Sequence, residues 1–280
     1  MNFIQTFWSC NKKTLLYDGF GFLSAEYNLM SWTLSCLQLK KYYSNLTLYT
    51  DSVAAKILID ELGLPYKEVI CNLDNLNQYH PHLWALPKIY SYSHQEKPFL
   101  HIDGDVFIWK SFDKEILKSE LIAQNAESDT NFYQSILENV KANFLYVPRA
   151  IINEVQIPRP VRAYNAGVLG GSDIVFFKEY CKQAFEFVDK NKGRLHKINI
   201  SNFNNIFEQL LFYCLAVERN KKVGVFISEE IKDLRYVGFA NFLEIPYNKQ
   251  YLHLHGEFKR NKIVCNQLVN PHVWILFLKH

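Results

Sequence analysis

The segment that decides the fold is Pro98-Phe99-Leu100-His101-Ile102-Asp103-Gly104-Asp105. An apolar run leads into two carboxylates that lie one residue apart, and we predict a buried strand over 99–108. Two carboxylates towards the end of such a strand can bind one hard divalent cation. The pattern is equally typical of an ordinary turn, in which Gly104 supplies the bend and both aspartates are only solvated.

The residues before this strand alternate between strand and helix patterns. Strands are predicted over 3–8, 46–50 and 67–71, and helices over 52–62 and 87–92. Asp51 is the predicted N-cap of the 52–62 helix, and Gly63 its left-handed C-cap. A further helix is predicted where apolar residues recur at spacings of four and three, at Leu23, Tyr27, Met30, Leu34 and Leu37.

Strands separated by helices predict an α/β fold, with a mostly parallel sheet covered on both faces. In the second half, strands are predicted over 121–125, 163–169 and 223–227, and helices from an N-cap at Ser172 and over 203–217. No linker separates the halves, so we predict one domain over 1–280, with a first half over 1–110 and a second half over 111–280. Ligands bind beyond the carboxyl ends of the strands in such sheets.

Composition excludes several classes of protein. A net charge of +3 does not indicate a nucleic-acid binder. Six scattered cysteines without a C-x-x-C pair indicate free thiols in a reducing cytosol. No signal peptide and no run of about 20 apolar residues is present. The apolar tail 273–278 predicts a last strand or docked helix, and it leaves open a peripheral contact with the inner face of a membrane.

Two later segments could complete a site at Asp103 and Asp105. Asn165, in Tyr164-Asn165-Ala166-Gly167-Val168-Leu169-Gly170-Gly171, can donate to and accept from sugar hydroxyls, although a buried strand entering a glycine turn explains the glycines equally well. His253, in His253-Leu254-His255-Gly256-Glu257-Phe258-Lys259, can complete a metal site, and Lys259 can meet a phosphate.

Together the three segments resemble the glycosyltransferases of the glycogenin and lipooligosaccharide-galactosyltransferase type, as an outlying member or a sister family. That family has an apolar strand ending in D-x-D, an Asn-Ala-Gly-Val segment and H-x-x-G-x-x-K near its C-terminus, and the chain has all three in this order. The resemblance implies the GT-A nucleotide-sugar fold, Rossmann-like in its sheet, with 1–110 as the nucleotide-binding half and 111–280 as the acceptor-side half that carries the C-terminal metal and diphosphate motif. It also implies a metal-dependent transfer of sugar from a nucleoside diphosphate, usually UDP, to a glycan or lipid-linked acceptor, with retention. Polysaccharide biosynthesis is the implied setting.

The resemblance also implies roles for single residues. Metal binding, by Mn²⁺ or Mg²⁺, falls to Asp103, Asp105 and His253, with His255 left open as the alternative imidazole. Donor binding falls to Asp103, Asp105, Gly256, Lys259, Lys88 and Trp8. The catalytic candidates that face the sugar are Gln209, Glu208 and Asn165.

The chain departs from the family's pattern on the acceptor side. The family has an acidic-Gln-acidic stretch where this chain has Glu208-Gln209-Leu210. Two other functions are therefore kept as alternatives, namely a sugar-phosphate nucleotidyltransferase and a non-catalytic domain that binds glycan or a partner. The first usually needs an arginine-rich loop after the first strand, and no arginine precedes Arg149. The oligomeric state stays open.

Overall fold

The computed structural model describes residues 1–10, 12–129, 131–270 and 273–274. The chain has a mixed α/β fold in two compact units, each built from separate stretches of sequence. Unit 1 contains residue 1, 78–101 and 113–235, and unit 2 contains 2–77, 102–112 and the described residues from 236 onward. The predicted α/β class is confirmed, whereas the single domain with two sequential halves stays a prediction. No helix of the described residues is long and apolar enough to cross a bilayer.

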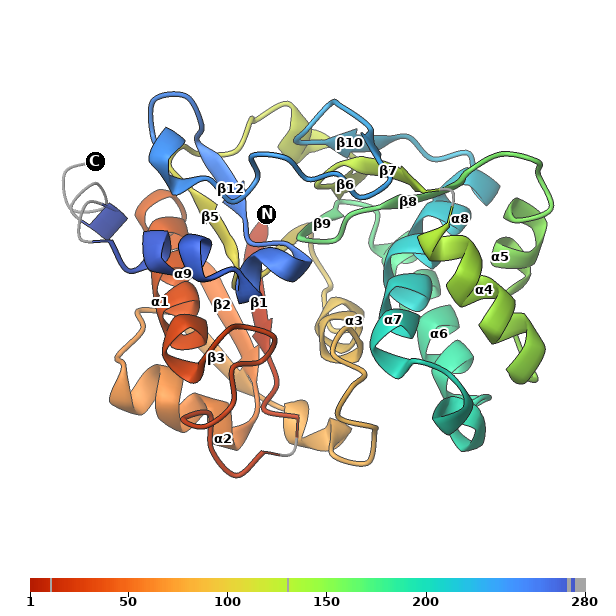
Figure 1. Ribbon diagram of the computed structural model, residues 1–280, viewed down its shortest axis with the longest axis horizontal. Helices are drawn as coiled ribbons and strands as arrows, with labels where there is room; N and C mark the ends of the chain where they lie inside the picture. Colours follow the sequence, from red (N-terminus) through yellow and green to blue (C-terminus); the bar gives the residue numbers. More distant parts are fainter. Residues whose placement is uncertain (11, 130, 271–272, 275–280) are drawn as a thin grey trace. The chain divides into compact units, whose positions relative to one another are not determined.

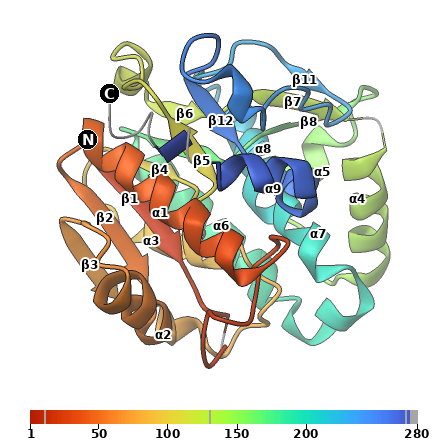
Figure 2. The same ribbon diagram turned by 60° about the vertical axis from the view of Figure 1, so that its left-hand side comes forward.

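Unit 2 contains a parallel part of the main sheet and a small antiparallel pair. Its strands are β1 (Asn2–Phe7), β2 (Leu46–Thr50), β3 (Glu68–Cys71), β5 (Val106–Ile108) and β12 (Tyr251–His253) (Figure 1). Strands β1, β2 and β3 are parallel neighbours, and β12 pairs antiparallel with β5. Its helices are α1 (Ala25–Tyr42), α2 (Ser52–Ala55), η1 (Lys56–Glu61), η2 (Leu73–Leu76), η6 (Phe242–Glu244), η7 (Gly256–Arg260) and α9 (Lys262–Leu268). Helix α1 packs against β5 and α9 (Figure 2).

Unit 1 contains further strands of the main sheet, which has seven strands among the described residues. In this unit its order is β10 (Val223–Val225), β6 (Leu121–Ala123), β9 (Val168–Gly171) and β4 (Phe99–Ile102), the last of which ends at the unit boundary. A second sheet has the order β11 (Ile231–Lys232), β7 (Ala126–Asp129) and β8 (Val161–Tyr164). The helices are α3 (Leu86–Ser93), η3 (Ile116–Lys118), α4 (Phe132–Asn143), α5 (Arg149–Glu154), α6 (Ile174–Asp189), η4 (Lys192–Lys197), α7 (Ile200–Asn205), η5 (Ile206–Leu210) and α8 (Leu211–Glu218).

Several predicted boundaries are confirmed by the local chemistry that suggested them. The Asp51 carboxylate accepts a hydrogen bond from the Ala54 amide at 2.9 Å, and Gly63 has a φ of 60° after the end of η1. The predicted helix over 52–62 therefore exists, although its second part is π-helical. The same holds for the predicted helix over 203–217, whose middle turn, η5, is π-helical.

Two predicted strands are interrupted, and one cap was assigned one residue too early. The strand over 163–169 is wrong, because β8 and β9 belong to different sheets and Asn165 lies between them. The N-cap of α6 is Asp173 and not Ser172, since the Asp173 carboxylate accepts a hydrogen bond from the Phe176 amide at 2.9 Å. The tail prediction over 273–278 lies largely outside the described residues, with only Val273 and Trp274 inside them.

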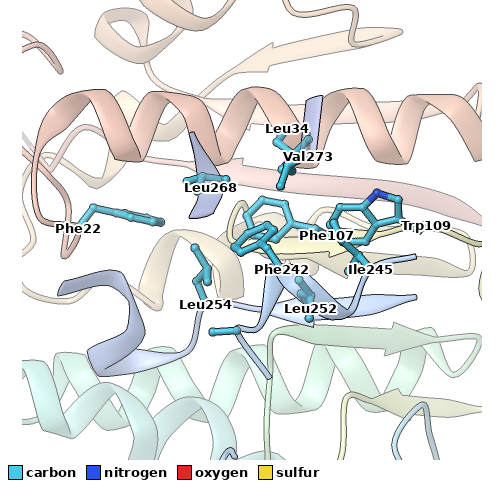
Figure 3. Packing of buried hydrophobic residues seen from close by; sticks show 11 residues of the cluster. Phe22, Leu34, Phe107, Trp109, Phe242, Ile245, Leu252, Leu254, Leu268 and Val273 are labelled. Atoms are coloured by element: carbon cyan, nitrogen blue, oxygen red, sulfur yellow. The ribbon is translucent and has the colours of Figure 1, made fainter. Parts of the chain in front are cut away.

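The hydrophobic core of unit 2 lies beside β5 and β12. Figure 3 shows Phe107 of β5, Leu252 of β12 and Phe242 of η6 packed into one cluster, with Phe107 and Phe242 ring centroids 5.5 Å apart. All three side chains are almost fully buried. Burying an aromatic or aliphatic side chain of this size stabilises a fold by about 1.5–3 kcal/mol. The cluster therefore holds these two short strands in place, and both lead to the candidate site.

Candidate metal and donor site

The paired aspartates lie on a turn between two strands, so the predicted continuous strand over 99–108 is wrong. Strand β4 ends at Ile102, β5 begins at Val106, and the Val106 amide donates a hydrogen bond to the Asp103 carbonyl at 3.1 Å. The turn lies against Trp32, because a Cβ built on Gly104 would meet a carbon of the indole ring at 2.2 Å. Only glycine fits this close approach.

A polar face of α1 holds the same turn. The Ser31 hydroxyl donates a hydrogen bond to the Gly104 carbonyl at 2.8 Å, and the Ser35 hydroxyl donates to the Val106 carbonyl at 2.7 Å. Gln5 of β1 donates to the Ser35 hydroxyl oxygen at 2.9 Å. Both serines are fully buried, so these bonds satisfy carbonyl groups that water does not reach.

This buried serine face is not the face that the sequence predicts for α1. The apolar stripe includes Leu23, which lies before the helix and is exposed, and Tyr27 and Met30, which are only partly buried. Tyr27 and Met30 pack against the cluster in Figure 3. Hydrophobic periodicity cannot reveal serines that are buried in order to hydrogen-bond a turn elsewhere in the chain.

Strand β12 brings His253 to the aspartates. In its antiparallel pairing with β5, His253 lies opposite Val106, and the Leu254 amide donates a hydrogen bond to the Asp105 carbonyl at 3.0 Å. The His253 Nε2 atom is 3.5 Å from Asp105 Oδ1. One ligand atom each from Asp103, Asp105 and His253 lies within 4.8 Å of the others. Strand β12 has only three residues and shows no periodic pattern in the sequence. Only the motif that begins at His253 predicted that this histidine lies near the two aspartates.

The three side chains fit a divalent cation. Two ligand atoms that are each about 2.1 Å from an ion lie about 3–4 Å apart, which is close to the observed spacing. Two carboxylates with one imidazole form a donor set suited to manganese or magnesium, and the imidazole favours the former. Asp105 and His253 are buried and Asp103 is half-buried, so the group is open on one side.

Lys259 supplies a positive charge at the same place. Its ammonium nitrogen lies 2.5 Å from Asp105 Oδ2 and 5.4 Å from the Phe22 ring centroid. Its carbonyl accepts a hydrogen bond from the Leu23 amide at 2.9 Å, which fixes the backbone of η7. Burial alone would raise the pKa of Asp105, but the charges of Lys259 and His253 lower it well below its usual range. Asp105 is therefore ionised.

The remaining residues of the His253–Lys259 motif form the turn between β12 and η7. Gly256 has a φ of 52° and open space around it, so the backbone conformation requires glycine here and no steric contact does. His255 stacks on Tyr236, with ring centroids 4.4 Å apart. Burial lowers the pKa of His255 to about 3, with further lowering from His253 and Lys259. Of the two histidines, His253 is the one that belongs to the candidate metal group.

Trp8 also lies in unit 2, at the end of β1. Its side chain is buried, and its indole nitrogen donates a hydrogen bond to the Asn77 side-chain oxygen at 3.4 Å. The next residue is tied to the end of β2, because the Ser9 amide donates a hydrogen bond to the Asp51 carboxylate. The buried Asp51 carboxylate thus joins the ends of two neighbouring parallel strands.

The other predicted residues lie in unit 1, on two separate elements and one junction. Lys88 of α3 is buried, and its ammonium nitrogen is 2.6 Å from Glu208 Oε1, which is also buried. Gln209 follows Glu208 on η5, and Asn165 accepts a hydrogen bond from the Gly167 amide at 2.9 Å. Lys88 is therefore not a surface lysine, and its charge is compensated inside unit 1.

Sequence reasoning missed Tyr133, which contacts Gln209, and Glu127, which contacts Tyr133. The Tyr133 hydroxyl is 2.8 Å from Gln209 Oε1 and also contacts Glu127 Oε1. Glu127 lies on β7, whose sequence Ala-Glu-Ser-Asp has no hydrophobic alternation and was not predicted as a strand. The only feature of the sequence that could have drawn attention to Glu127 is its position in a short polar segment between two predicted elements.

The fold and the Asp-Asp-His group define a mixed α/β protein with a candidate site for a divalent cation. A family model matches residues 1–273, so the chain belongs to that family, which is described as a family of unknown function (DUF6734). No curated protein matches the chain. Among solved structures, the chain is similar to an active-site mutant of LgtC, with 12% sequence identity, a TM-score of 0.37, and coverage of 74% of this chain and 70% of that one.

Proposed function

We propose that the protein is a metal-dependent glycosyltransferase that moves a sugar from a nucleoside diphosphate, of the UDP type, to a hydroxyl of a glycan or lipid-linked acceptor. The observation that carries the proposal is the group Asp103, Asp105 and His253 with Lys259 beside it. A site of three metal ligands with a lysine ammonium group beside them suits a diphosphate, which needs compensation of several negative charges. The sequence resemblance to the D-x-D glycosyltransferases supports the same conclusion.

In this proposal Asp103, Asp105 and His253 hold Mn²⁺ or Mg²⁺. When bound, the cation supplies Lewis-acid stabilisation of the charge that develops on the leaving diphosphate. Lys259 then leaves Asp105 and binds a phosphate oxygen, adding a second positive charge that is in place before the sugar departs. We assign the backbone amides of the left-handed turn at Gly256 to the same phosphates.

The residues that we assign to the sugar lie in unit 1. Gln209 and Asn165 orient sugar hydroxyls through their amides, which can both donate and accept. The Glu208 carboxylate is compensated by Lys88, so we assign Glu208 to the positioning of Lys88 and not to proton removal. With no free base assigned, transfer with retention is the proposed outcome, and the leaving phosphate accepts the proton of the acceptor hydroxyl. Trp8 at the end of β1 is the proposed contact of the base.

The setting of the reaction is also part of the proposal. We place it in the cytoplasm, at or near the inner face of a membrane, where surface polysaccharides are assembled on lipid-linked acceptors. The sequence resemblance supports this placement.

The test is a donor screen with product identification. The protein is incubated with MnCl₂ and a panel of UDP-, GDP- and CDP-sugars, and released nucleoside diphosphate is measured with and without EDTA. We expect release with at least one donor, abolished by EDTA and reduced more than about 100-fold in Asp103→Ala and Asp105→Ala. Asp60→Asn, an exposed aspartate of unit 2, is the control.

Two outcomes would overturn the proposal. Pyrophosphate release from a nucleoside triphosphate and a sugar phosphate would identify a nucleotidyltransferase. Absence of manganese-dependent binding of UDP, GDP and CDP in calorimetry would identify a non-catalytic domain.

A further inference from the structure

Three buried side chains of unit 1 form a hydrogen-bonded chain that ends at Gln209. Glu127 of β7, Tyr133 of α4 and Gln209 of η5 are 1%, 0% and 6% exposed. The Tyr133 hydroxyl contacts Glu127 Oε1, and it is 2.8 Å from Gln209 Oε1. Two elements that are neighbours in the sequence, β7 and α4, thus meet the distant η5 at one phenolic oxygen.

The single hydroxyl proton of Tyr133 limits how the hydrogen bonds among these three side chains can be arranged. A tyrosine hydroxyl has one proton, so it can donate to only one of two acceptor atoms. The oxygen and nitrogen of a glutamine side chain are assigned from the surrounding hydrogen bonds. An ionised Glu127 accepts the proton of Tyr133, because a carboxylate is the stronger acceptor. Gln209 must then present its NH₂ group to the phenolic oxygen and donate to it, which requires exchanging its amide oxygen and nitrogen relative to the orientation in the structure, where Oε1 faces Tyr133.

The local backbone supports a functional role for this residue. Gln209 lies in the π-helical turn Ile206–Leu210, inside an otherwise α-helical run from α7 to α8. Such turns occur frequently at functional sites, because they change which side chains a helix directs inward. Here both Glu208 and Gln209 are buried, and Tyr180 donates a hydrogen bond to the Glu208 carbonyl at 2.9 Å.

We propose that Glu127 and Tyr133 are positioning residues that lock the Gln209 amide, with its NH₂ group on Tyr133 and its carbonyl oxygen presented to a hydroxyl of the transferred sugar. The inference rests on the proposed function for the identity of the ligand. The fixed orientation of the Gln209 amide, which we call the lock, is inferred from the contacts among Glu127, Tyr133 and Gln209 alone. Since hydrogen bonds are strong in a buried polar network, the chain keeps the amide from rotating when the sugar binds.

The first test does not depend on activity. The full chain is labelled with ¹⁵N-glutamine, and the Gln209 side-chain signal is assigned with Gln209→Glu. We expect one slowly exchanging Gln209 amide proton, with its protection lowered at least about tenfold in Tyr133→Phe, because the phenolic acceptor is gone. An unprotected Gln209 amide in the unmodified protein, or unchanged protection in Tyr133→Phe, would overturn the lock.

The second test separates positioning from folding. With a donor found in the screen, we expect Tyr133→Phe and Glu127→Ala to lower kcat about tenfold, with donor KM and manganese-dependent nucleoside diphosphate affinity within twofold of the unmodified protein. Glu127→Gln keeps an acceptor for Tyr133, so it should retain kcat within about threefold. Tyr79→Phe, which removes an exposed hydroxyl bonded to Asp189, is the control.

The two proposals fail in different ways. Full kcat in Tyr133→Phe, or equal losses in all Glu127 variants and in nucleotide affinity, would overturn the positioning role. A protein that turns over none of the donors but keeps the protected Gln209 amide would contradict the glycosyltransferase proposal alone. The lock would then remain, and its ligand would be of another class.

Discussion

The ammonium nitrogen of Lys259 lies 2.5 Å from Oδ2 of Asp105, one of the three side chains that form the candidate metal group. The lysine therefore already pairs with the carboxylate of one candidate metal ligand. Both partners are held by unit 2, Asp105 by the turn before β5 and Lys259 by η7. The ion pair and the metal compete for one carboxylate, and this competition can be measured.

Replacing Lys259 with glutamine should change metal and nucleotide binding in opposite directions. Without the ammonium group, Asp105 is free, so Mn²⁺ should bind about tenfold more tightly. Manganese-dependent UDP binding should weaken by about tenfold, because one cation for the diphosphate is lost. Calorimetry with MnCl₂, and then with UDP at saturating MnCl₂, measures both. The exposed Lys262→Gln on α9 is the control, and equal manganese affinity in all three proteins would argue against the competition.

Replacing Gly104 with alanine should damage the turn and the site together. The new Cβ would lie 2.2 Å from the Trp32 ring, and the turn is tied to the same helix by the hydrogen bond from the Ser31 hydroxyl to the Gly104 carbonyl. Overpacking of this kind costs about 1–3 kcal/mol of unfolding free energy. Urea unfolding should show this loss, together with weaker manganese binding. Gly193→Ala is the matched control, because nothing lies within 4 Å of its Cβ, and a stability equal to that of Gly104→Ala would contradict the prediction.

Removing the Ser35 hydroxyl should test the polar face of α1. In Ser35→Ala, the Val106 carbonyl and the Gln5 side chain both lose a buried partner. A buried group left without its hydrogen bond costs about 1–3 kcal/mol. Thermal unfolding should show the loss, whereas Ser135→Ala on the exposed face of α4 should change stability by less than about 0.5 kcal/mol. A neutral Ser35→Ala would mean that water replaces the hydroxyl.

The cap of α6 predicts a stability that depends on pH. Partial burial alone would raise the pKa of Asp173, but hydrogen bonds from Lys221 and from the Phe176 amide lower it below its usual value. A lowered folded-state pKa contributes stability above the usual aspartate range, and the contribution is lost as pH falls through the folded pKa. Asp173→Ala should therefore cost about 1 kcal/mol at pH 7, the usual value of such a cap.

The same variant gives the check at low pH. Urea midpoints should differ less between Asp173→Ala and the unmodified protein at pH 3 than at pH 7, because the carboxyl group becomes protonated. Asp60→Asn provides the baseline for an exposed aspartate. A difference that grows as pH falls would have the wrong sign and would refute the assignment.

Local chemistry explains which sequence predictions were confirmed. Asp51 and Gly63 bound a helix through a cap and a left-handed turn, and both depend only on neighbouring residues. The strands over 99–108 and 163–169 failed for the opposite reason. Each predicted strand is interrupted at a polar residue, the first at Asp103 and the second at Asn165. Apolar residues stand on both sides of each interruption, so the sequence pattern looks continuous.

The sequence by itself determined the α/β class, most helix and strand positions, and the three motif segments, because periodicity, caps and motif spacing are local properties of a chain. Only the tertiary structure decided which side chains meet. The pairing of β12 with β5 places His253 at Asp105, and η7 places Lys259 on the same carboxylate. It also decided that Tyr133 joins Glu127 to Gln209. Such meetings depend on strand register and packing between residues distant in the chain, and hydrophobic periodicity does not encode them.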